Sequence, residues 1–221
     1  MALAAPKHVP VERIASVKLR HKWSNYDPYK PVGQPDKEIQ AILRKVSNRG
    51  ITTFALGCAE WVVYRLSKHV EEPTPYHYLE AFWVFVMGRD KALPPPTEHE
   101  DWLGRVRGAI NLALMTTLNT VLLSEEGPPV KNGALSAAIV EHVLPPEEIR
   151  LSFRPWRDQV LNRLLRHSAR DAKAPDGNPL PRQILDPAVP LSDSEIPRQI
   201  QQFLGVVDFA ANPLLSGLPR K

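Results

Sequence analysis

The stretch that decides the fold is residues 52–70, TTFALGCAEWVVYRLSKHV. In a helix, with about 100° between successive residues, its apolar side chains span well over half of the circumference. These side chains are Phe54, Ala55, Cys58, Ala59, Trp61, Val62, Val63 and Leu66. So wide an apolar arc needs neighbours on more than one side. We therefore predict that this segment is an internal helix.

Proline-rich segments separate this stretch from the other apolar stretches. The chain has 23 prolines among 221 residues, twice the usual share of about 5%. Proline fits the first turn of a helix but disrupts its interior, so these segments mark helix starts and stops. They are Thr74-Pro75, Pro94-Pro95-Pro96-Thr97, Pro128-Pro129 and Pro145-Pro146. Helices are expected over about 35–49, 52–70, 74–88, 97–127, 133–143 and 155–170, with a short last helix after Ser192.

Two of these helices carry an additional expectation. Residues 82–86, taken alone, suit a buried strand as well as a helix, and the sequence leaves both open. Thr97 and Glu100 form a capping box, in which side chains and backbone amides satisfy each other at a helix start. Because an apolar stripe runs from Trp102 to Val121, we expect the helix after Thr97 to be the central one.

The pattern as a whole predicts an all-α fold, a single compact domain of six or seven helices. The helical domain is expected over residues 35–205, with a loop-like insert at 171–192. A proline-rich N-terminal arm, basic and aromatic, is expected over residues 1–34, and a C-terminal tail over residues 206–221.

Composition favours a cytoplasmic protein. Cys58 is the one cysteine, which excludes an intramolecular disulfide and a multi-cysteine zinc site and suits a reducing compartment. The longest uncharged stretch, 108–124, has 17 residues, whereas a membrane span needs about 20 mostly apolar residues. The N-terminus lacks the basic start and apolar run of a signal peptide. We expect no membrane association.

Charge is unevenly distributed along the chain, although the net charge is only +4. Residues 1–50 carry 10 Lys or Arg and 4 Asp or Glu, residues 51–149 carry 7 and 13, and residues 150–221 carry 11 and 7. The acidic middle either attracts the basic ends of the same chain or leaves them free for an acidic partner.

The acidic middle contains the residue types that a metal site needs. They are His69, Glu71, Glu72, His77, Glu80, Asp90, His99, Glu100 and Asp101. His77 and Glu80 share a helix face, but His99 lacks the second histidine four residues later that a zincin motif requires. Most of the acidic groups lie near expected helix ends, where they act as caps. We predict no metal and no cofactor, and a metal-dependent enzyme stays the second alternative.

No catalytic motif is evident elsewhere. The chain has no G-x-S-x-G, P-loop or G-x-G-x-x-G pattern. Cys58, on the apolar side of its helix, is expected to be an inert core thiol. Arg65 falls within the same apolar arc, where its guanidinium needs a carboxylate, a backbone acceptor or a path to solvent. The sequence therefore predicts that the protein is not an enzyme.

Two groups of side chains are candidates for binding a partner. The first is an aromatic cluster in the N-terminal arm, whose alternative role is packing of the arm on the core. The second is an arginine ridge opposite the apolar stripe of the helix expected near 155–170. The six residues are Trp23, Tyr26, Tyr29, Arg163, Arg166 and Arg170. Tryptophan, tyrosine and arginine dominate binding hot spots in protein interfaces.

These observations predict a non-catalytic protein that binds another protein. The most concrete form of this prediction is an immunity-type inhibitor, which binds and neutralises a partner toxin or enzyme. The first alternative is a helical nucleic-acid-binding protein that contacts phosphates through the arginine ridge. The sequence lacks a recognisable nucleic-acid-reading motif, so protein binding is favoured.

Overall fold

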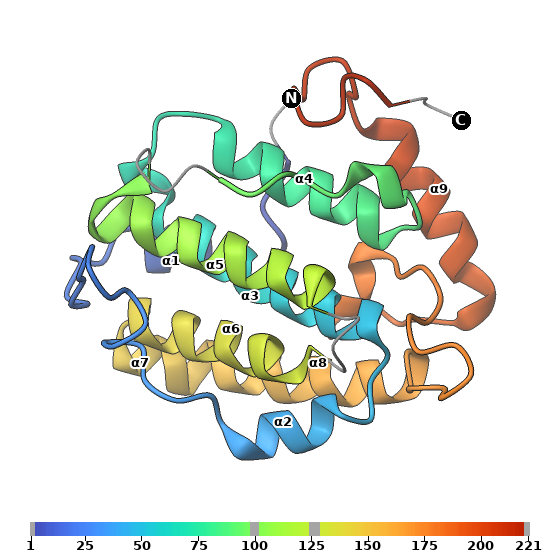
Figure 1. Cartoon of the computed structure of the whole chain (residues 1–221), viewed down its shortest axis with the longest axis horizontal. Coiled ribbons are helices and arrows are strands. Elements are labelled where there is room, and N and C mark those ends of the chain that lie inside the picture. The colour runs from blue at the N-terminus through green and yellow to red at the C-terminus, as the bar shows by residue number, and fades with distance from the viewer. Residues whose placement is uncertain (1–2, 98–101, 124–128, 219–221) are drawn as a thin grey trace.

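The computed structural model describes residues 3–97, 102–123 and 129–218. Over these residues the fold is all-α, as predicted, and contains no strand (Figure 1). The α-helices are α1 (Val11–Ala15), α2 (Lys37–Leu43), α3 (Asn48–Leu66), α4 (Thr74–Val86), α5 (Gly104–Leu122), α6 (Val130–Val143), α7 (Pro146–Glu148), α8 (Arg154–His167) and α9 (Ile196–Val206). Short 3-10 turns cover Ser67–His69, Asp90–Ala92, Arg182–Leu185 and Asp193–Glu195, and a π-helical turn covers Ile149–Phe153. In these three segments, no helix is long and apolar enough to cross a membrane.

The helix α3 lies at the centre of the fold, as the width of its apolar arc predicts. Every residue from Gly50 to Leu66 is buried. α3 packs against α1, α4, α5, α6 and α8, and in Figure 1 it runs behind α5, which lies between α4 and α6. The rings of Phe54 and Trp61 both pack on Trp156 of α8, at centroid distances of 6.4 and 5.7 Å.

The start of α3 differs from the prediction, and a distant loop is the reason. The helix begins at Asn48, and Gly50, expected to end the preceding helix, lies in its first turn. Ser47 is the N-cap, and its hydroxyl accepts a hydrogen bond from the Gly50 amide at 3.1 Å. The amides of Asn48 and Arg49 donate to the carbonyls of Pro175 and Asp176, at 2.8 and 3.0 Å. The first amide groups of a helix have no acceptor within the helix itself. In α3 two of them are hydrogen-bonded to carbonyls of the loop before α9.

Two other expectations about helices are resolved. Residues 82–86 belong to α4 and are helical. The helix expected to start at Thr97 begins instead at Gly104, whose φ of 86° is a conformation that favours glycine. Glu100 of the capping box lies outside the described residues, and the Thr97 hydroxyl donates to Asn111. The prediction that this helix is the central one is wrong, because α5 exposes polar and apolar side chains such as Arg105 and Leu122.

The N-terminal arm lies against the body of the protein and is fixed by Arg65. This side chain is only 1% exposed. It donates from Nη1 to the Ile14 carbonyl at 2.8 Å, from Nη2 to the Val17 carbonyl at 2.9 Å and from Nε to the Val143 carbonyl at 3.3 Å. Arg65 therefore uses backbone acceptors, one of the three solutions that its position in the apolar arc allows.

The first residues of the arm are held by contacts of their own. The Tyr64 hydroxyl donates to the Leu3 carbonyl at 2.7 Å, and the His8 ring stacks on Trp156 at 5.1 Å. Arg182 donates to the Ala4 carbonyl at 2.9 Å and pairs with the fully buried Glu60 at 2.6 Å. The first residues of the arm are therefore packed on α3, α8 and the 3-10 turn at Arg182–Leu185.

The C-terminal tail covers one side of α4. Phe209 and Leu215 are buried in a small cluster with Ala81 and Val84 of α4. Asn212 is 1% exposed, and its Nδ2 donates to Glu80 Oε2 at 2.9 Å and to the His77 carbonyl at 3.0 Å. The Asn212 amide and the apolar contacts of Phe209 and Leu215 thus hold the described part of the tail.

Candidate functional site

The two predicted groups of binding residues lie on opposite sides of the molecule. In Figure 1 the aromatic segment of the arm is at the left, in dark blue, and the end of α8 is at the right, in orange. α8 carries Arg163 and Arg166, whereas Arg170, expected on the same helix, lies beyond its last residue, His167. The aromatic cluster and the arginine ridge therefore do not form a single site, and each is described separately.

Within the aromatic cluster, Trp23 has a different role from the two tyrosines. Its indole covers Gly108 of α5 so closely that a Cβ at Gly108 would overlap the ring. Tyr26 is 100% exposed and Tyr29 is 46% exposed. Partial burial of the Tyr29 ring raises the pKa of its hydroxyl. Trp23 is thus a packing residue of the arm, whereas Tyr26 presents its whole side chain to solvent.

Hydrogen bonds order the loop that carries Tyr26, which we call the Tyr26 loop and define as residues 23–33. Asn25 Oδ1 accepts from Trp23 Nε1 at 2.7 Å and from the Gly104 amide of α5 at 2.8 Å. The Ser24 hydroxyl accepts from the Asp27 amide, and Asp27 Oδ1 accepts from the Lys30 amide at 3.1 Å. These turn contacts fix the backbone on both sides of Tyr26.

The arginine ridge is largely used within the protein. Arg163 donates to the carbonyls of Gln183 and Ile184, both at 3.0 Å, and its burial lowers the pKa of the guanidinium. Arg170 donates to Asn48 Oδ1 at the start of α3. Arg166 is exposed. A continuous basic surface for phosphates is therefore not formed by these three side chains, which weakens the nucleic-acid alternative.

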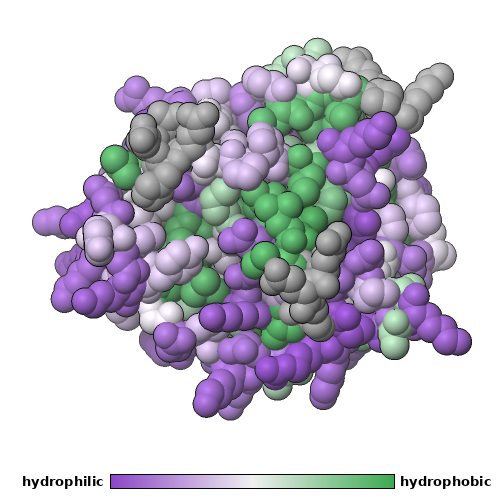
Figure 2. All heavy atoms as spheres, viewed as in Figure 1, coloured by the Kyte–Doolittle hydropathy of each residue, from purple (hydrophilic) through white to green (hydrophobic). Residues whose placement is uncertain are grey.

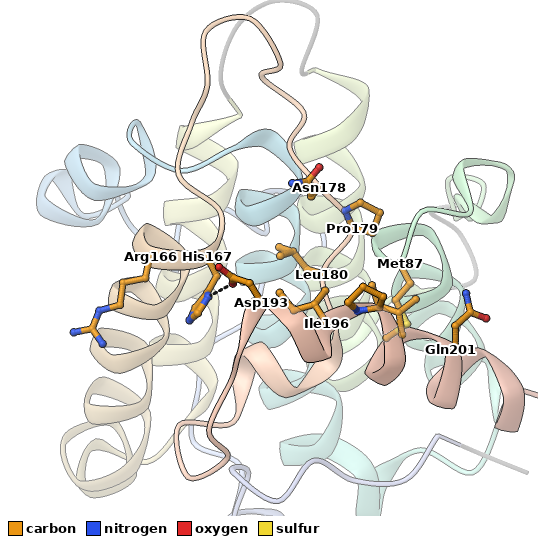
Figure 3. Close-up of a pocket in the computed structure, with 11 residues that line it drawn as sticks. Met87, Arg166, His167, Asn178, Pro179, Leu180, Asp193, Ile196 and Gln201 are labelled. Carbon is orange, nitrogen blue, oxygen red and sulfur yellow. Dashed lines mark hydrogen bonds and ion pairs between the residues drawn. The ribbon is translucent and has the colours of Figure 1, made fainter.

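Arg166 lies at the edge of a cavity of about 560 Å³ between α8, α9 and the end of α4 (Figure 3). Six lining residues are apolar or proline, and five are polar or charged. They are Met87, Pro179, Leu180, Ile196, Pro197 and Ile200, with Arg166, His167, Asn178, Asp193 and Gln201. We call this the α8–α9 cavity. Its size lies in the range of ligand sites, and its lining is about evenly divided between apolar and polar residues.

Local sequence features bring these distant segments together. Gly88 has φ of 95° and turns the chain at the end of α4, and Pro179 sits so close to it that a Cβ there would be 3.0 Å from the proline ring. The Leu180 amide then donates to the Val86 carbonyl at 3.3 Å. Residues 178–180 are thus held beside Met87, and α9 closes the other side (Figure 3).

His167 and Asp193 form the best-defined polar contact in the cavity wall. His167 Nδ1 lies 2.7 Å from Asp193 Oδ1, and Figure 3 shows the two side chains facing each other while Arg166 points away from the cavity. A carboxylate at Nδ1 fixes the orientation of an imidazole and directs Nε2 elsewhere. Among the described residues of the lining, none is a serine, threonine or cysteine that this pair would activate.

The residues considered for metal binding and covalent catalysis have other surroundings. Glu80 accepts from Asn212, and His99, Glu100 and Asp101 lie outside the described residues. Across residues 3–97, 102–123 and 129–218, no group of three His, Cys, Asp or Glu side chains is placed to hold a metal ion. Cys58 is fully buried, which raises the pKa of its thiol to about 12. A thiol in this state is a poor nucleophile, as expected from its position on α3.

An apolar surface is visible over the C-terminal half of α5 (Figure 2). Leu122 and Leu123 are 52% and 41% exposed there. The chain continues directly from them into residues 124–128, which lie outside the described structure. We place no binding site on this surface.

Sequence reasoning missed the α8–α9 cavity. The apolar positions Ile196 and Ile200 are visible as one stripe of the last helix, but their partners Met87 and Leu180 belong to segments far away in the chain. The glycine and proline at Gly88 and Pro179 are the only local signals, and both also fit ordinary turns.

Comparison with known proteins adds no relative. No protein-family model matches the chain, and no curated protein and no solved structure matches it.

Proposed function

We propose that this protein acts by binding another protein and does not catalyse a reaction on it. The observation that supports the proposal most is Tyr26, a completely exposed tyrosine on a hydrogen-bonded loop. Exposed tyrosines contribute large contact area and a hydroxyl to interfaces, and they are enriched among binding hot spots.

The order of the Tyr26 loop adds to this argument. Binding costs free energy when side chains and loops must be immobilised, and a preformed loop reduces that cost. Trp23 packs on Gly108 on one side of Tyr26, and Asn25 joins the loop to α5. The body of the protein therefore holds Tyr26 in position before a partner arrives.

An immunity-type inhibitor is the concrete form in which we propose this function. Such a protein needs a stable body, an exposed anchor and no chemistry of its own. The burial of the Cys58 thiol is consistent with that, and so is the α8–α9 cavity, whose described lining residues include no serine, threonine or cysteine. Its partner would be an enzyme or toxin whose activity falls on stoichiometric binding.

Capture of the partner and substitution of Tyr26 test the proposal together. The tagged full chain is used to capture proteins from nuclease-treated lysate, and the dissociation constant of the complex is then measured with purified partner. We expect Tyr26→Ala to weaken binding by about tenfold or more, the loss of a hot-spot side chain. Tyr26→Phe, which keeps the ring, separates the contribution of the hydroxyl.

Val206→Ala is the matched control. Val206 is 81% exposed at the end of α9, on the side of the molecule away from the Tyr26 loop (Figure 1). The Val206→Ala substitution is expected to leave the dissociation constant of the complex unchanged. Unchanged affinity of Tyr26→Ala for a captured partner would contradict this placement of the interface. Complexes that contain only nucleic acid would contradict the proposed function itself, and a partner whose activity is unaffected would contradict the inhibitor.

A further inference from the structure

We propose that His21 and His142 form a pH-sensitive latch, which holds the Tyr26 loop on the body of the protein and releases it in acid. The latch lies directly before Trp23, the first residue of the loop. Its consequence, that acid weakens binding of the partner, rests on the proposed function. The latch itself is a property of the free chain, and it is therefore testable without a partner.

The latch consists of two imidazoles that donate to backbone carbonyls of different segments. His21 Nε2 lies 2.8 Å from the carbonyl oxygen of Arg105, in the first turn of α5. His142 Nε2, near the end of α6, lies 2.7 Å from the carbonyl oxygen of Lys22. A carbonyl oxygen only accepts hydrogen bonds, so each Nε2 carries a hydrogen. Residues 21 and 22 are thereby tied to the ends of α5 and α6, at the left of Figure 1.

The site accommodates a neutral His21 ring and disfavours a charged one. The residue is only 7% exposed. With the hydrogen on Nε2, the neutral ring has an unprotonated Nδ1, which is buried and has no hydrogen-bond partner among the described residues. Protonation would add an N–H and a positive charge at an atom that no described group accepts from. Burying such a donor and charge costs free energy, which the ring avoids by leaving the site.

The groups around His21 oppose a further positive charge. The charged or titratable side chains near it come from three helices and from the arm itself. They are Arg65 of α3, Arg105 of α5, His142 of α6, Arg20 and Lys22. The His142 ring stands edge-on to the His21 ring at a centroid distance of 5.5 Å. Glu141, which precedes His142, is paired with two arginines of α8.

These surroundings fix the direction of the pH response. Burial lowers the pKa of His21 below 6.5; the hydrogen bond to the Arg105 carbonyl opposes this shift, and His142, Arg105 and Arg65 add to it. In the released loop the pKa returns to about 6.5. The released state thus binds a proton that the latched state does not. The latch is therefore complete above pH 6.5 and weakens as pH falls through this value toward the lowered pKa.

The part of the arm before the latch should stay in place in acid. Arg65 holds that part through backbone carbonyls, and these contacts include no histidine. Beyond the latch, Trp23 packs on Gly108 and Asn25 accepts from an α5 amide. Both contacts require that residues 21 and 22 keep the chain beside α5. Opening of the latch therefore frees the Tyr26 loop alone.

NMR of the full chain tests the latch in two ways. The His21 imidazole should titrate below pH 6.5. Between pH 7 and pH 5 the equilibrium constant for release should rise about five- to twentyfold, within the limit of tenfold per pH unit for one proton. Hydrogen-exchange protection of the Gly104 amide, which donates to Asn25, measures this constant. Protection is taken relative to an unstructured chain at the same pH, and interior amides of α3 serve as the reference.

His21→Gln separates the hydrogen bond of the latch from its titration. The glutamine side chain keeps an N–H donor for the Arg105 carbonyl but binds no proton in this range. Protection of the Gly104 amide should therefore be the same at pH 7 and pH 5. His8→Phe is the matched control, because His8 is the other histidine of the arm whose pKa is lowered by burial. This variant should keep the pH dependence of the loop.

Each outcome bears on one of the two proposals. Titration of His21 at or above pH 6.5 in the unmodified chain overturns the latch, and so does a pH dependence of Gly104 protection that persists in His21→Gln. The dissociation constant of a captured partner should rise between pH 7 and pH 5 by at least about threefold more for the unmodified chain than for His21→Gln. Equal rises would overturn the control of binding by the latch while the proposed function stands. A working latch in a chain that captures no partner protein would support the latch and count against the proposed function.

Discussion

The N-terminal arm and the C-terminal tail both lie on the body of the protein, but different forces hold them. Arg65, a buried cation from the central helix, donates to the Ile14, Val17 and Val143 carbonyls and thus anchors the arm. The tail is held by Asn212, an uncharged amide that belongs to the tail itself and reaches Glu80 of α4.

The difference predicts how strongly each end is coupled to the fold. Arg65 donates hydrogen bonds to carbonyls of two other segments of the chain, whereas the Asn212 amide donates to α4 alone, and removing a buried partner costs the desolvation of what it leaves behind. Loss of the arm would expose part of α3, the centre of the core, whereas loss of the tail would expose one side of α4. We therefore expect the arm to unfold with the whole domain and the tail to open locally.

The largest effect is expected from Arg65→Met. The substitution keeps an apolar side chain of similar length but removes the donors of the Ile14, Val17 and Val143 carbonyls. We expect the free energy of unfolding to fall by about 3–5 kcal/mol. The free energy of unfolding of both proteins is measured by urea denaturation. Arg65→Lys, which keeps the charge with a shorter reach, should lose less. A loss under about 1 kcal/mol for Arg65→Met would show that the arm does not depend on this side chain.

Acid should weaken the arm through His8. Its pKa is lowered from 6.5 to about 3, chiefly by burial and further by Arg182. Below pH 6.5 the unfolded chain binds a proton at His8 that the folded chain does not, so stability present above pH 6.5 is lost as pH falls toward 3. Between about pH 7 and pH 5 we expect a loss of about 2 kcal/mol that His8→Phe does not show. His8→Phe keeps an aromatic ring against Trp156, and equal losses in both proteins would contradict the assignment.

Gly108→Ala tests whether Trp23 is a packing residue of the arm. The new Cβ overlaps the Trp23 indole, so we expect a net destabilisation of about 1–2 kcal/mol despite the better helix propensity of alanine. In a Trp23→Ala background the same change should become neutral or stabilising. Gly205→Ala in α9, where nothing lies within 4 Å of the new Cβ, is the control. A Gly108→Ala effect that is the same in both backgrounds would argue against the contact.

The smallest effect is expected from Asn212→Ala in the tail. It removes the hydrogen bonds to Glu80 and His77, and Glu80 regains water when the tail opens. We expect a loss of about 1 kcal/mol or less in the free energy of global unfolding. Amide hydrogen exchange over residues 207–218 should rise strongly while α3 stays protected. If α3 exchanged faster as well, the tail would be as tightly coupled to the core as the arm.

Local patterns predicted the fold well and its contacts poorly. The apolar width of α3 and the proline positions depend on nearby residues, so the all-α class and most helices follow from the sequence. The start of α3 does not, because its amides pair with Pro175 and Asp176. Trp23 and Tyr26 look equivalent in sequence, and only the contact with Gly108 distinguishes the partly buried ring of Trp23 from the exposed ring of Tyr26. Arg163 and Arg170 share a helical spacing with Arg166 but bond to carbonyls and to Asn48.

The closure of α3 by residues 175 and 176 has a consequence for the order in which the chain folds. The amides of Asn48 and Arg49 reach their native acceptors only when the ribosome has released the chain beyond residue 176. During synthesis the central helix therefore lacks its N-terminal partners while most of the domain already exists. Contacts of such long sequence separation slow folding. We therefore expect the native packing of the core to be completed late, after the segment before α9 has been synthesised.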